Sequence, residues 1–377
     1  MIKILVDASN IKVGGGLQVA ISVITELESS HSDNYSFSYL VSNKVYSQLS
    51  DSIKIKCIVN TTGIINLIPF NKVSSNLREM SRSFDCVFSI FGPAFWNPRS
   101  THVIGFANAW IVSDKSDAYK VYSFQFKCFY KLKNFILGKL LFSNKKFYIT
   151  ETESVRALFI EKFRARSDRI AVVPNSLPYT YDTINPYSGK YQEKLKYYKH
   201  YFKFVSITYN YPHKNLNIIE KVGELLELKG IKAIFIVTFP KLEYDKQSFA
   251  FKKYTVNMGP VSVEDCESLY KSADALFLPT LIECFSVSYL EAMVNKICIT
   301  TSHYDFAKDV CDDCAMYFDP FSPQDVANKL ATLICNEDIR REMIIKGEKR
   351  INTFFNNKHK VLSYLQIINN VIGKNHV

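Results

Sequence analysis

The chain has 377 residues, of which 47% are hydrophobic, which is more than one typical core requires and enough for two. Its 47 Lys and Arg against 36 Asp and Glu give a formal net charge of +11. A net positive charge of this size favours an anionic partner. Nucleic acid, an acidic membrane surface and a phosphorylated small molecule all fit this description.

The cysteines and the apolar runs indicate where the protein is found. Nine cysteines lie scattered, mostly inside apolar runs, which suits a reducing cytoplasm. The opening stretch MIKILVDAS has an apolar run that is too short for a signal peptide. The longest apolar run, 135–142, is interrupted by Lys139 and is far below the ~20 residues that a membrane-spanning helix needs. We therefore expect a cytoplasmic protein.

Short β-rich runs alternate with longer amphipathic segments along the first half of the chain. This alternation is typical of parallel strands joined by crossover helices, so the predicted fold class is α/β. We predict strands near 2–8, 35–42, 53–60, 84–90, 101–107, 146–151 and 169–174, and helices at 17–29 and 153–164.

A second alternating series follows a stretch without clear periodicity, from Pro174 to Lys203, where we place a domain boundary. Its predicted strands are 202–209, 232–239, 274–280 and 296–302, and its predicted helices are 215–229, 262–272, 285–295 and 323–336. The sequence thus predicts one domain over 1–180, a second over 181–355, and a C-terminal segment, 356–377, whose helix crosses back to the first domain.

Three glycines, 14–16, separate the first strand from the helix that begins at Leu17. Such a turn lets the backbone approach a phosphate closely. The run lacks the spacing GxGxxG, and no acidic residue ends the second strand, which disfavours a nicotinamide-dependent oxidoreductase.

The segment 115–147 interleaves eight Lys and nine aromatic residues with a single Asp. Such a segment can lie on an anionic membrane surface. The alternative is a core helix whose lysine side chains extend outward. Basic residues among aromatics also suit single-stranded nucleic acid, but no strand pattern of a nucleic-acid-binding domain accompanies them, and we expect no nucleic acid partner.

The stretch FLPTLIECFSVSYLEAM, 277–293, combines a buried strand, a short loop with Glu283 and a helix with Glu291. Ligands of open α/β sheets bind at this edge, and the amides of Phe285 and Ser286 at the helix start suit an anionic phosphate. Carboxylates accept hydrogen bonds from vicinal hydroxyls, so one can face a sugar and the other a ribose. The alternative is a pair of solvated charges at a helix start.

Lys214 lies after one predicted strand and before a helix, where an ammonium can neutralise a leaving diphosphate. A lone Lys on a loop is otherwise simply solvated. The pair Cys311 and Cys314 lacks the second pair of ligands that a zinc site needs, and we interpret it as a turn between two elements.

These motifs resemble those of the family 4 glycosyltransferases, whose signature is two glutamates spaced as Glu283 and Glu291 are. Further similar segments precede and follow that signature, at 146–163, 172–177, 256–280 and 314–330. The stretch VDASNIKVGGGLQVA resembles members that assemble bacterial polysaccharides and O-antigen. The resemblance implies the GT-B fold, in which two Rossmann-like domains face across a cleft, and sugar transfer with retention of anomeric configuration.

The resemblance also implies roles for single residues on the donor side. Glu283 would bind the hydroxyls of the donor sugar and Glu291 the ribose. Lys214 and the amides of Phe285 and Ser286 would bind the diphosphate, and Val261 lies in the turn beside the base. The family's second phosphate cation, an Arg, is not matched, because Tyr209 and Asn210 occupy that region.

In the first domain, the resemblance places Gly15 and Gly16 in a loop facing the cleft. It places His102 and Asn108 near the acceptor, although a structural role is the simpler alternative for His102. No DxD motif ends a strand, so we expect no metal and no cofactor, the nucleotide sugar being a substrate.

The predicted function is transfer of a hexose from a nucleoside diphosphate sugar to a saccharide acceptor on a lipid diphosphate carrier, in surface polysaccharide synthesis. The enzyme would be cytoplasmic and peripheral at the anionic inner face of the membrane. Two alternatives stay open: a non-catalytic basic protein that binds membranes or nucleic acid, and a nicotinamide-dependent oxidoreductase.

Overall fold

The computed structural model describes residues 1–12, 14–29, 34–63, 66, 71–177, 181, 191–354 and 356–375. The chain divides into two compact units. The first unit comprises Met1–Asp114, Cys128–Tyr179 and Phe355–Val377, and the second comprises Lys115–Lys127 and Thr180–Phe354. The sequence-based boundaries were 180 and 355, and they left the segment Lys115–Lys127 in the first domain.

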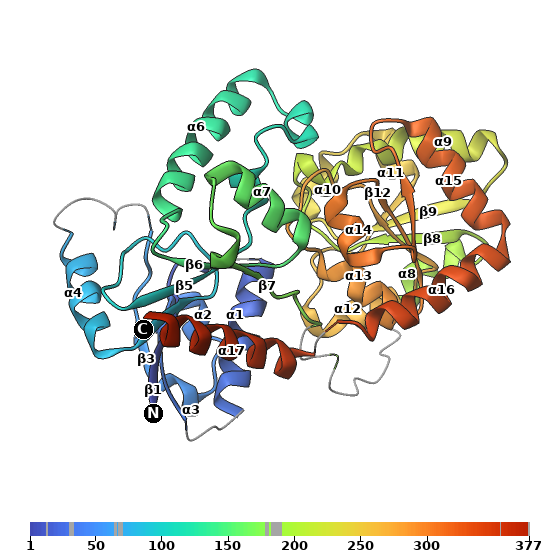
Figure 1. The fold of residues 1–377 in the computed structure, drawn as a ribbon. Helices are drawn as coiled ribbons and strands as arrows, with labels where there is room; N and C mark the ends of the chain where they lie inside the picture. The colour runs from blue at the N-terminus through green and yellow to red at the C-terminus, as the bar shows by residue number, and fades with distance from the viewer. Residues whose placement is uncertain are drawn as a thin grey trace. The chain divides into compact units, whose positions relative to one another are not determined.

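The first unit contains a parallel sheet of seven strands in the order β3-β2-β1-β4-β5-β6-β7 (Figure 1). Its strands are β1 (Ile2–Ala8), β2 (Tyr35–Val41), β3 (Cys57–Val59), β4 (Cys86–Ser89), β5 (Thr101–Phe106), β6 (Phe147–Thr150) and β7 (Ile170–Val172). Each matches a predicted strand. The prediction over 53–60 was wrong at its start, because Ser50 begins a helical turn, α3 (Asp51–Lys54), before the strand.

Helices cover both faces of this first sheet. They are α1 (Gly15–Ser29), α2 (Asn43–Tyr46), α4 (Lys72–Met80), α5 (Ala109–Val112), α6 (Phe124–Leu141), α7 (Glu153–Phe163) and α17 (Asn357–Asn375). One face packs against α1 and α17, with Val6, Phe88 and Tyr364 in the shared core. The other face packs Trp96 against Leu77 of α4. The C-terminal helix therefore completes the core of the first unit (Figure 1).

The second unit contains a parallel sheet of six strands in the order β10-β9-β8-β11-β12-β13. Its strands are β8 (Phe202–Ser206), β9 (Ala233–Val237), β10 (Thr255–Asn257), β11 (Ala275–Leu278), β12 (Cys298–Ser302) and β13 (Ala315–Phe318). The sequence did not predict β10 and β13. They are the two edge strands, and their three and four residues are too few to show a periodicity.

The helices of the second unit are α8 (Gln192–Leu195), α9 (Ile219–Leu228), α10 (Lys241–Asp245), α11 (Phe249–Lys253), α12 (Val263–Tyr270), α13 (Val287–Val294), α14 (Asp305–Cys311), α15 (Pro323–Cys335) and α16 (Glu337–Ile351). Phe204, Phe235 and Phe277 share a core with α9 and α15 on one face of the sheet. Helix α16 was not predicted. Cys311 ends α14 and Cys314 precedes β13, which confirms the predicted turn.

The strand order of the second unit reverses between β8 and β11, which are neighbours in the sheet. Ala275 of β11 pairs with Phe204 of β8, so the carboxyl ends of these two strands lie side by side. Ligands of open α/β sheets bind at such a reversal, beside the carboxyl ends of the strands. The loops that follow β8 and β11 carry Lys214 and Glu283.

Candidate active site

The loop after β8 presents Lys214 at the end of a single helical turn, Pro212–Lys214. Proline occupies the first position of this turn, where its fixed φ is favourable, and Asn215 ends it with φ of 56°. The Asn215 side chain donates a hydrogen bond of 2.7 Å to the Pro320 carbonyl after β13. Local turn chemistry and this long-range bond together fix the backbone that carries Lys214.

The loop after β11 presents Glu283 and is tied directly to the Lys214 turn. The Leu281 amide donates to the His213 carbonyl at 2.8 Å. The Thr280 hydroxyl is buried and donates to Glu283 Oε1 at 3.1 Å. The two loops therefore form one unit at the point where the strand order reverses.

Lys214 and Glu283 form an ion pair between Nζ and Oε1. Their side chains are 17% and 16% exposed, so solvent screens the pair only in part. These two residues were expected to bind separate parts of the donor, and the structure brings them into contact. Glu283 Oε1 also accepts the Thr280 bond, whereas within the described part of the chain Oε2 accepts none. Oε2 is therefore available to accept a further hydrogen bond.

Glu291 lies on α13 and is 8% exposed. Its Oε2 accepts a hydrogen bond of 2.8 Å from the Tyr270 hydroxyl at the end of α12. Burial raises the pKa of Glu291 to about 7, and the Tyr270 bond opposes this rise. The carboxyl group is thus protonated at a higher pH than an exposed glutamate would be. Tyr270 was not predicted from the sequence, because no motif marks a residue 21 positions away as the partner of Glu291.

Phe285 and Ser286 lie where α13 begins, as predicted from the strand, loop, helix pattern. Ser286 is extended and its side chain makes no capping hydrogen bond, so the first amides of α13 are not satisfied by that side chain. Uncapped amides at a helix start suit an anionic group. The Phe285 ring packs edge-on against Phe354, with ring centroids 6.0 Å apart.

The remaining donor-side candidates line other loops of the second unit. Asn210 is half-buried and follows Tyr209, which is 57% exposed at the position where the resemblance expects an Arg. Val261 is half-buried and follows the turn at Gly259, whose φ of 77° favours glycine. Neither Asn210 nor Val261 forms a hydrogen bond with the Lys214 and Glu283 pair.

The first-unit candidates do not form one cluster. Gly15 and Gly16 open α1, and it is Gly14, with φ of 74°, that needs a glycine. Asn108 precedes α5 without capping it through its side chain.

His102 is only 5% exposed within the first unit. Its Nε2 lies 3.0 Å from the Ser89 hydroxyl, which donates to Asp7. Burial lowers the pKa of His102 well below its usual value, and Lys146 lowers it further. Asp7 also accepts from Ser9 and Trp96, so the Nε2 side of the ring joins an internal network, whereas the buried Nδ1 has no hydrogen-bond partner among the described residues. Burial of His102 favours the structural alternative, and its contact with an acceptor stays a prediction.

The second unit is similar to a known protein family. Residues 199–350 match the family model described as Glycosyl transferases group 1. No curated protein matches the chain. The matched segment contains Lys214, Glu283 and Glu291, and its similarity to glycosyl transferases agrees with the expected class of enzyme.

Solved structures resemble the chain over nearly its whole length. A glycosyltransferase from Rickettsia africae is 13% identical, with 98% of each chain covered and a TM-score of 0.72. HepE of Anabaena, in complex with UDP-glucose, is 14% identical over 97% of this chain and 100% of that one, with a TM-score of 0.70. WaaG, a glycosyltransferase involved in lipopolysaccharide biosynthesis, is 14% identical over 97% and 99%, also with a TM-score of 0.70. At these identities the likeness shows the fold, and it confirms the predicted α/β class and GT-B architecture.

Proposed function

We propose that the chain transfers a sugar from a nucleoside diphosphate sugar to a hydroxyl group, with retention of anomeric configuration. The observation that carries the proposal is the Lys214 and Glu283 pair at the strand-order reversal, within the segment that matches glycosyl transferases of group 1. The complex of the similar Anabaena protein with UDP-glucose supports a nucleotide sugar as donor.

The site can stabilise the departure of a diphosphate. Negative charge grows on the phosphate as the glycosidic bond breaks, and a fixed ammonium stabilises that charge more in the transition state than in the ground state. Lys214 supplies this charge, and the uncapped amides of α13 add oriented dipoles. Glu283 Oε2 accepts a hydroxyl of the donor sugar, while Glu291 binds the ribose. The protein thus contributes positioning and electrostatics.

A panel of nucleotides tests this function. A ligand that binds only the folded state raises the melting temperature, and the rise grows with the logarithm of the ligand concentration relative to its Kd. We expect one of the UDP or GDP sugars to raise Tm, and NAD to leave it unchanged. A rise with NAD and none with any nucleotide sugar would instead support the oxidoreductase alternative.

We further propose that the acceptor is a saccharide on a lipid diphosphate carrier, and that the enzyme binds the anionic inner face of the cell membrane. The support is the outer face of α6. Four of its apolar side chains, spaced at helical intervals on that face, are between 49% and 63% exposed: Phe129, Leu132, Phe135 and Ile136. No helix in the described ranges is long and apolar enough to span a bilayer, so α6 would lie on the surface.

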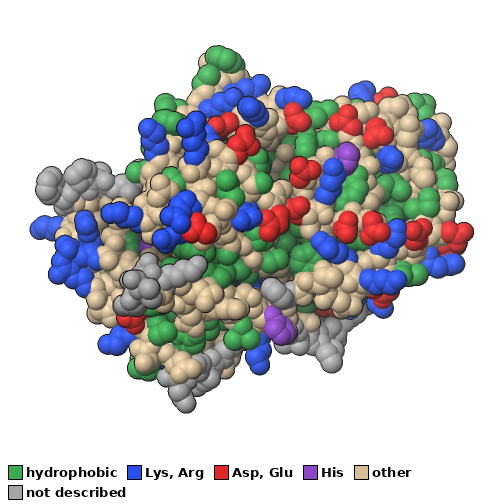
Figure 2. Space-filling model, viewed as in Figure 1, with side chains coloured by type: hydrophobic (Ala, Val, Ile, Leu, Met, Phe, Trp, Pro, Cys, Tyr) green, Lys and Arg blue, Asp and Glu red, His purple; other side chains and the backbone are tan. Residues whose placement is uncertain are grey.

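Lysines accompany this apolar face of α6. Lys127, Lys131, Lys133 and Lys139 lie on the same helix, and Lys139 extends over the Phe135 ring at 4.8 Å. Figure 2 shows hydrophobic and basic side chains together on α6, at the top of the view. Apolar side chains provide a shallow insertion into the headgroup region, and lysines provide attraction to anionic lipids. The similar WaaG acts in lipopolysaccharide biosynthesis, which agrees with a surface polysaccharide as product.

We expect the four α6 lysines, changed together to Gln, to weaken binding to anionic vesicles at least tenfold, since each Lys near the surface contributes about 1 kcal/mol. Co-sedimentation with vesicles of mixed neutral and anionic phospholipid measures this. Binding should weaken with salt, because exposed charges are screened.

The matched control removes the same charge from the second unit by changing the exposed Lys221, Lys229, Lys241 and Lys246 to Gln. It should bind vesicles almost as wild type does. Equal losses in both variants would mean that net charge, not the α6 face, governs binding. Failure of the wild type to bind anionic vesicles at low salt would contradict the membrane proposal and leave the sugar-transfer proposal intact.

A further inference from the structure

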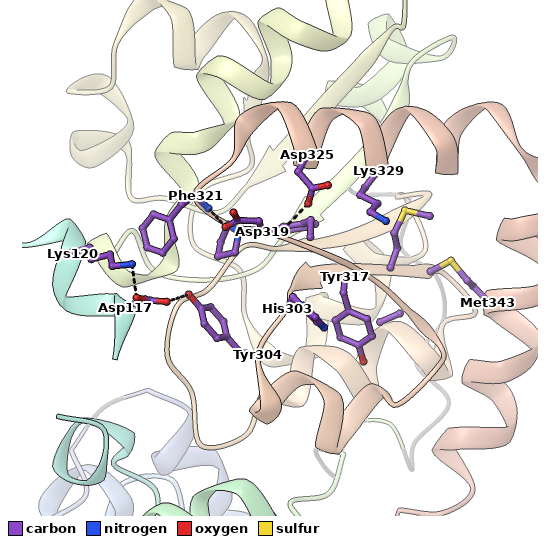
Figure 3. Close-up of a pocket in the computed structure, with 14 residues that line it drawn as sticks. Asp117, Lys120, His303, Tyr304, Tyr317, Asp319, Phe321, Asp325, Lys329 and Met343 are labelled. Carbon is purple, nitrogen blue, oxygen red and sulfur yellow. Dashed lines mark hydrogen bonds and ion pairs between the residues drawn. The ribbon is translucent and has the colours of Figure 1, made fainter. Parts of the chain in front are cut away.

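The segment Asp117–Tyr122 comes from the first half of the sequence but packs on the second unit. It leads into α6 and crosses the loops that follow β12 and β13. Asp117 accepts a hydrogen bond of 3.0 Å from the Tyr304 hydroxyl, and Lys120 lies 5.0 Å from the centre of the Phe321 ring. Figure 3 shows these contacts at one end of a cavity of about 940 Å³.

The third contact of this segment reaches the turn that carries Lys214. The Tyr122 hydroxyl and His213 Nδ1 are 3.0 Å apart. The Tyr122 ring is itself stacked on Phe126, in the first turn of α6, with centroids 4.0 Å apart and planes 6° from parallel. Tyr122 is therefore held on one side by α6 and hydrogen bonded on the other to the residue next to Lys214.

His213 is fixed at several points. Its carbonyl accepts the Leu281 amide, which joins it to the Glu283 loop, and its ring is stacked on Tyr211 at 5.5 Å. Burial, with a smaller effect of Lys214, lowers the pKa of His213 to about 4. The ring is therefore neutral at physiological pH and adds no positive charge beside Lys214. Its role in this arrangement is geometric.

We propose that Tyr122 and His213 are positioning residues that hold the Lys214 turn in register with the Glu283 loop, so that the ammonium meets the β-phosphate of the donor. This inference rests on the proposed function and deepens it. A lysine side chain loses rotational freedom when it is ordered against a ligand. If the backbone that carries it is already fixed, less conformational entropy is lost on binding. A hydroxyl that comes from a distant part of the sequence supplies this constraint.

The test compares nucleoside diphosphates with monophosphates by calorimetry, using UDP against UMP and GDP against GMP. The affinity ratio within a pair isolates the β-phosphate, which is the part that Lys214 would bind. We expect Lys214→Ala to bring this affinity ratio close to one, because the diphosphate then loses its additional contact. Tyr122→Phe should lower the ratio about threefold to tenfold, the usual effect of one hydrogen bond, while leaving the monophosphate affinity unchanged.

Two further variants separate positioning from general destabilisation. His213→Asn keeps an amide near the position of Nδ1, and we expect it to keep most of the diphosphate-to-monophosphate affinity ratio. His213→Ala has no group that can bond to Tyr122, and we expect its ratio to fall. Tyr254→Phe is the matched control, because it also removes one tyrosine hydroxyl of the second unit, bonded at 2.7 Å to Glu227, away from these loops. It should bind all four nucleotides as wild type does.

Each result has a distinct meaning. A normal ratio in Tyr122→Phe, with the ratio lost in Lys214→Ala, overturns the positioning role and leaves the proposed function standing. Equal weakening of mono- and diphosphate binding by Tyr122→Phe also overturns it, because the effect would then be merely structural. A normal ratio in Lys214→Ala, or no binding of either diphosphate by wild type, contradicts the proposed function itself and the positioning role with it.

Discussion

Replacing Lys214 with Ala is expected to lower kcat by ~10²- to 10³-fold, the usual cost of removing one fixed group that stabilises transition-state charge. The effect on KM for the donor should be smaller, since the charge on the leaving diphosphate is greatest in the transition state. Steady-state kinetics under saturating donor measures both constants. Equal kcat values for variant and wild type would show that Lys214 does not stabilise the leaving group.

The ion pair with Glu283 requires a second variant, because Lys214→Ala leaves a partly buried carboxylate without its cation. An unpaired buried charge destabilises its surroundings. The double variant Lys214→Ala, Glu283→Gln removes both charges, and we expect it to remain as slow as the single variant. Recovery of activity in the double variant would mean that the stranded carboxylate, and not the lost ammonium, caused the defect.

Lys203→Ala is the matched control for loss of an ion-paired lysine. Lys203 pairs with Asp274 at 3.0 Å, with 20% of its side chain exposed. It lies on β8, before the carboxyl end from which the Lys214 loop leaves. We expect its loss to change stability slightly and kcat little.

Glu291 is expected to make nucleotide binding depend on pH around neutrality. Its pKa is raised by burial to about 7, so the carboxyl group that we propose as the ribose ligand becomes ionised as pH rises through that value. A charged acceptor hydrogen-bonds more strongly than a neutral one, by ~1 to 2 kcal/mol. Affinity for the nucleoside diphosphate should therefore increase from about pH 6 to about pH 8.

Glu291→Gln should remove this increase and bind more weakly at high pH. The ligand phosphates titrate equally in both experiments, so the difference between wild type and variant isolates Glu291. Glu267→Gln is the control, because Glu267 lies on α12 in an ion pair with Lys271 and shows the effect of losing a nearby carboxylate. Parallel pH profiles for wild type and Glu291→Gln would exclude Glu291 as a ribose ligand.

The same pKa shift has an opposite consequence for the stability of the free protein. The pKa of Glu291 is higher in the folded state than its ordinary value of 4.5, so the folded state binds the proton more tightly. Stabilisation is fully present below 4.5 and is lost as pH rises through about 7. The free energy of unfolding should fall by ~3 kcal/mol across that interval. Chemical denaturation of Glu291→Gln should show a flatter profile.

Local patterns in the sequence were sufficient for the fold class and for most elements. Alternation of β-rich and amphipathic runs predicted all seven strands of the first sheet and the four inner strands of the second, because buried parallel strands have a distinct composition. The same reasoning missed Thr255–Asn257 and Ala315–Phe318, which are strands only because a neighbouring strand pairs with them. It also missed Glu337–Ile351, whose many charges obscure its apolar side.

Some features of the candidate site were also predictable from the sequence, whereas others depend on the fold. The strand, loop, helix pattern and the glutamate spacing identified Glu283 and Glu291 from the sequence, because their chemistry is local to one segment. The pairing of Lys214 with Glu283 depends on β8 and β11 being neighbours, which follows from the order of strands in the sheet. The raised pKa of Glu291 depends on the packing of α12 against α13.

The sequence by itself therefore determined an α/β fold with two glutamates at a strand end, together with a resemblance to glycosyltransferases, since periodicity and motif spacing are local properties. Only the tertiary structure decided that Tyr122 touches His213, 91 residues later, and that the face of α6 with Phe129 and Leu132 is exposed rather than buried. Contacts between distant segments depend on how crossover connections bring strand ends and helices together. A pattern within a short stretch of sequence cannot predict which distant segments come into contact.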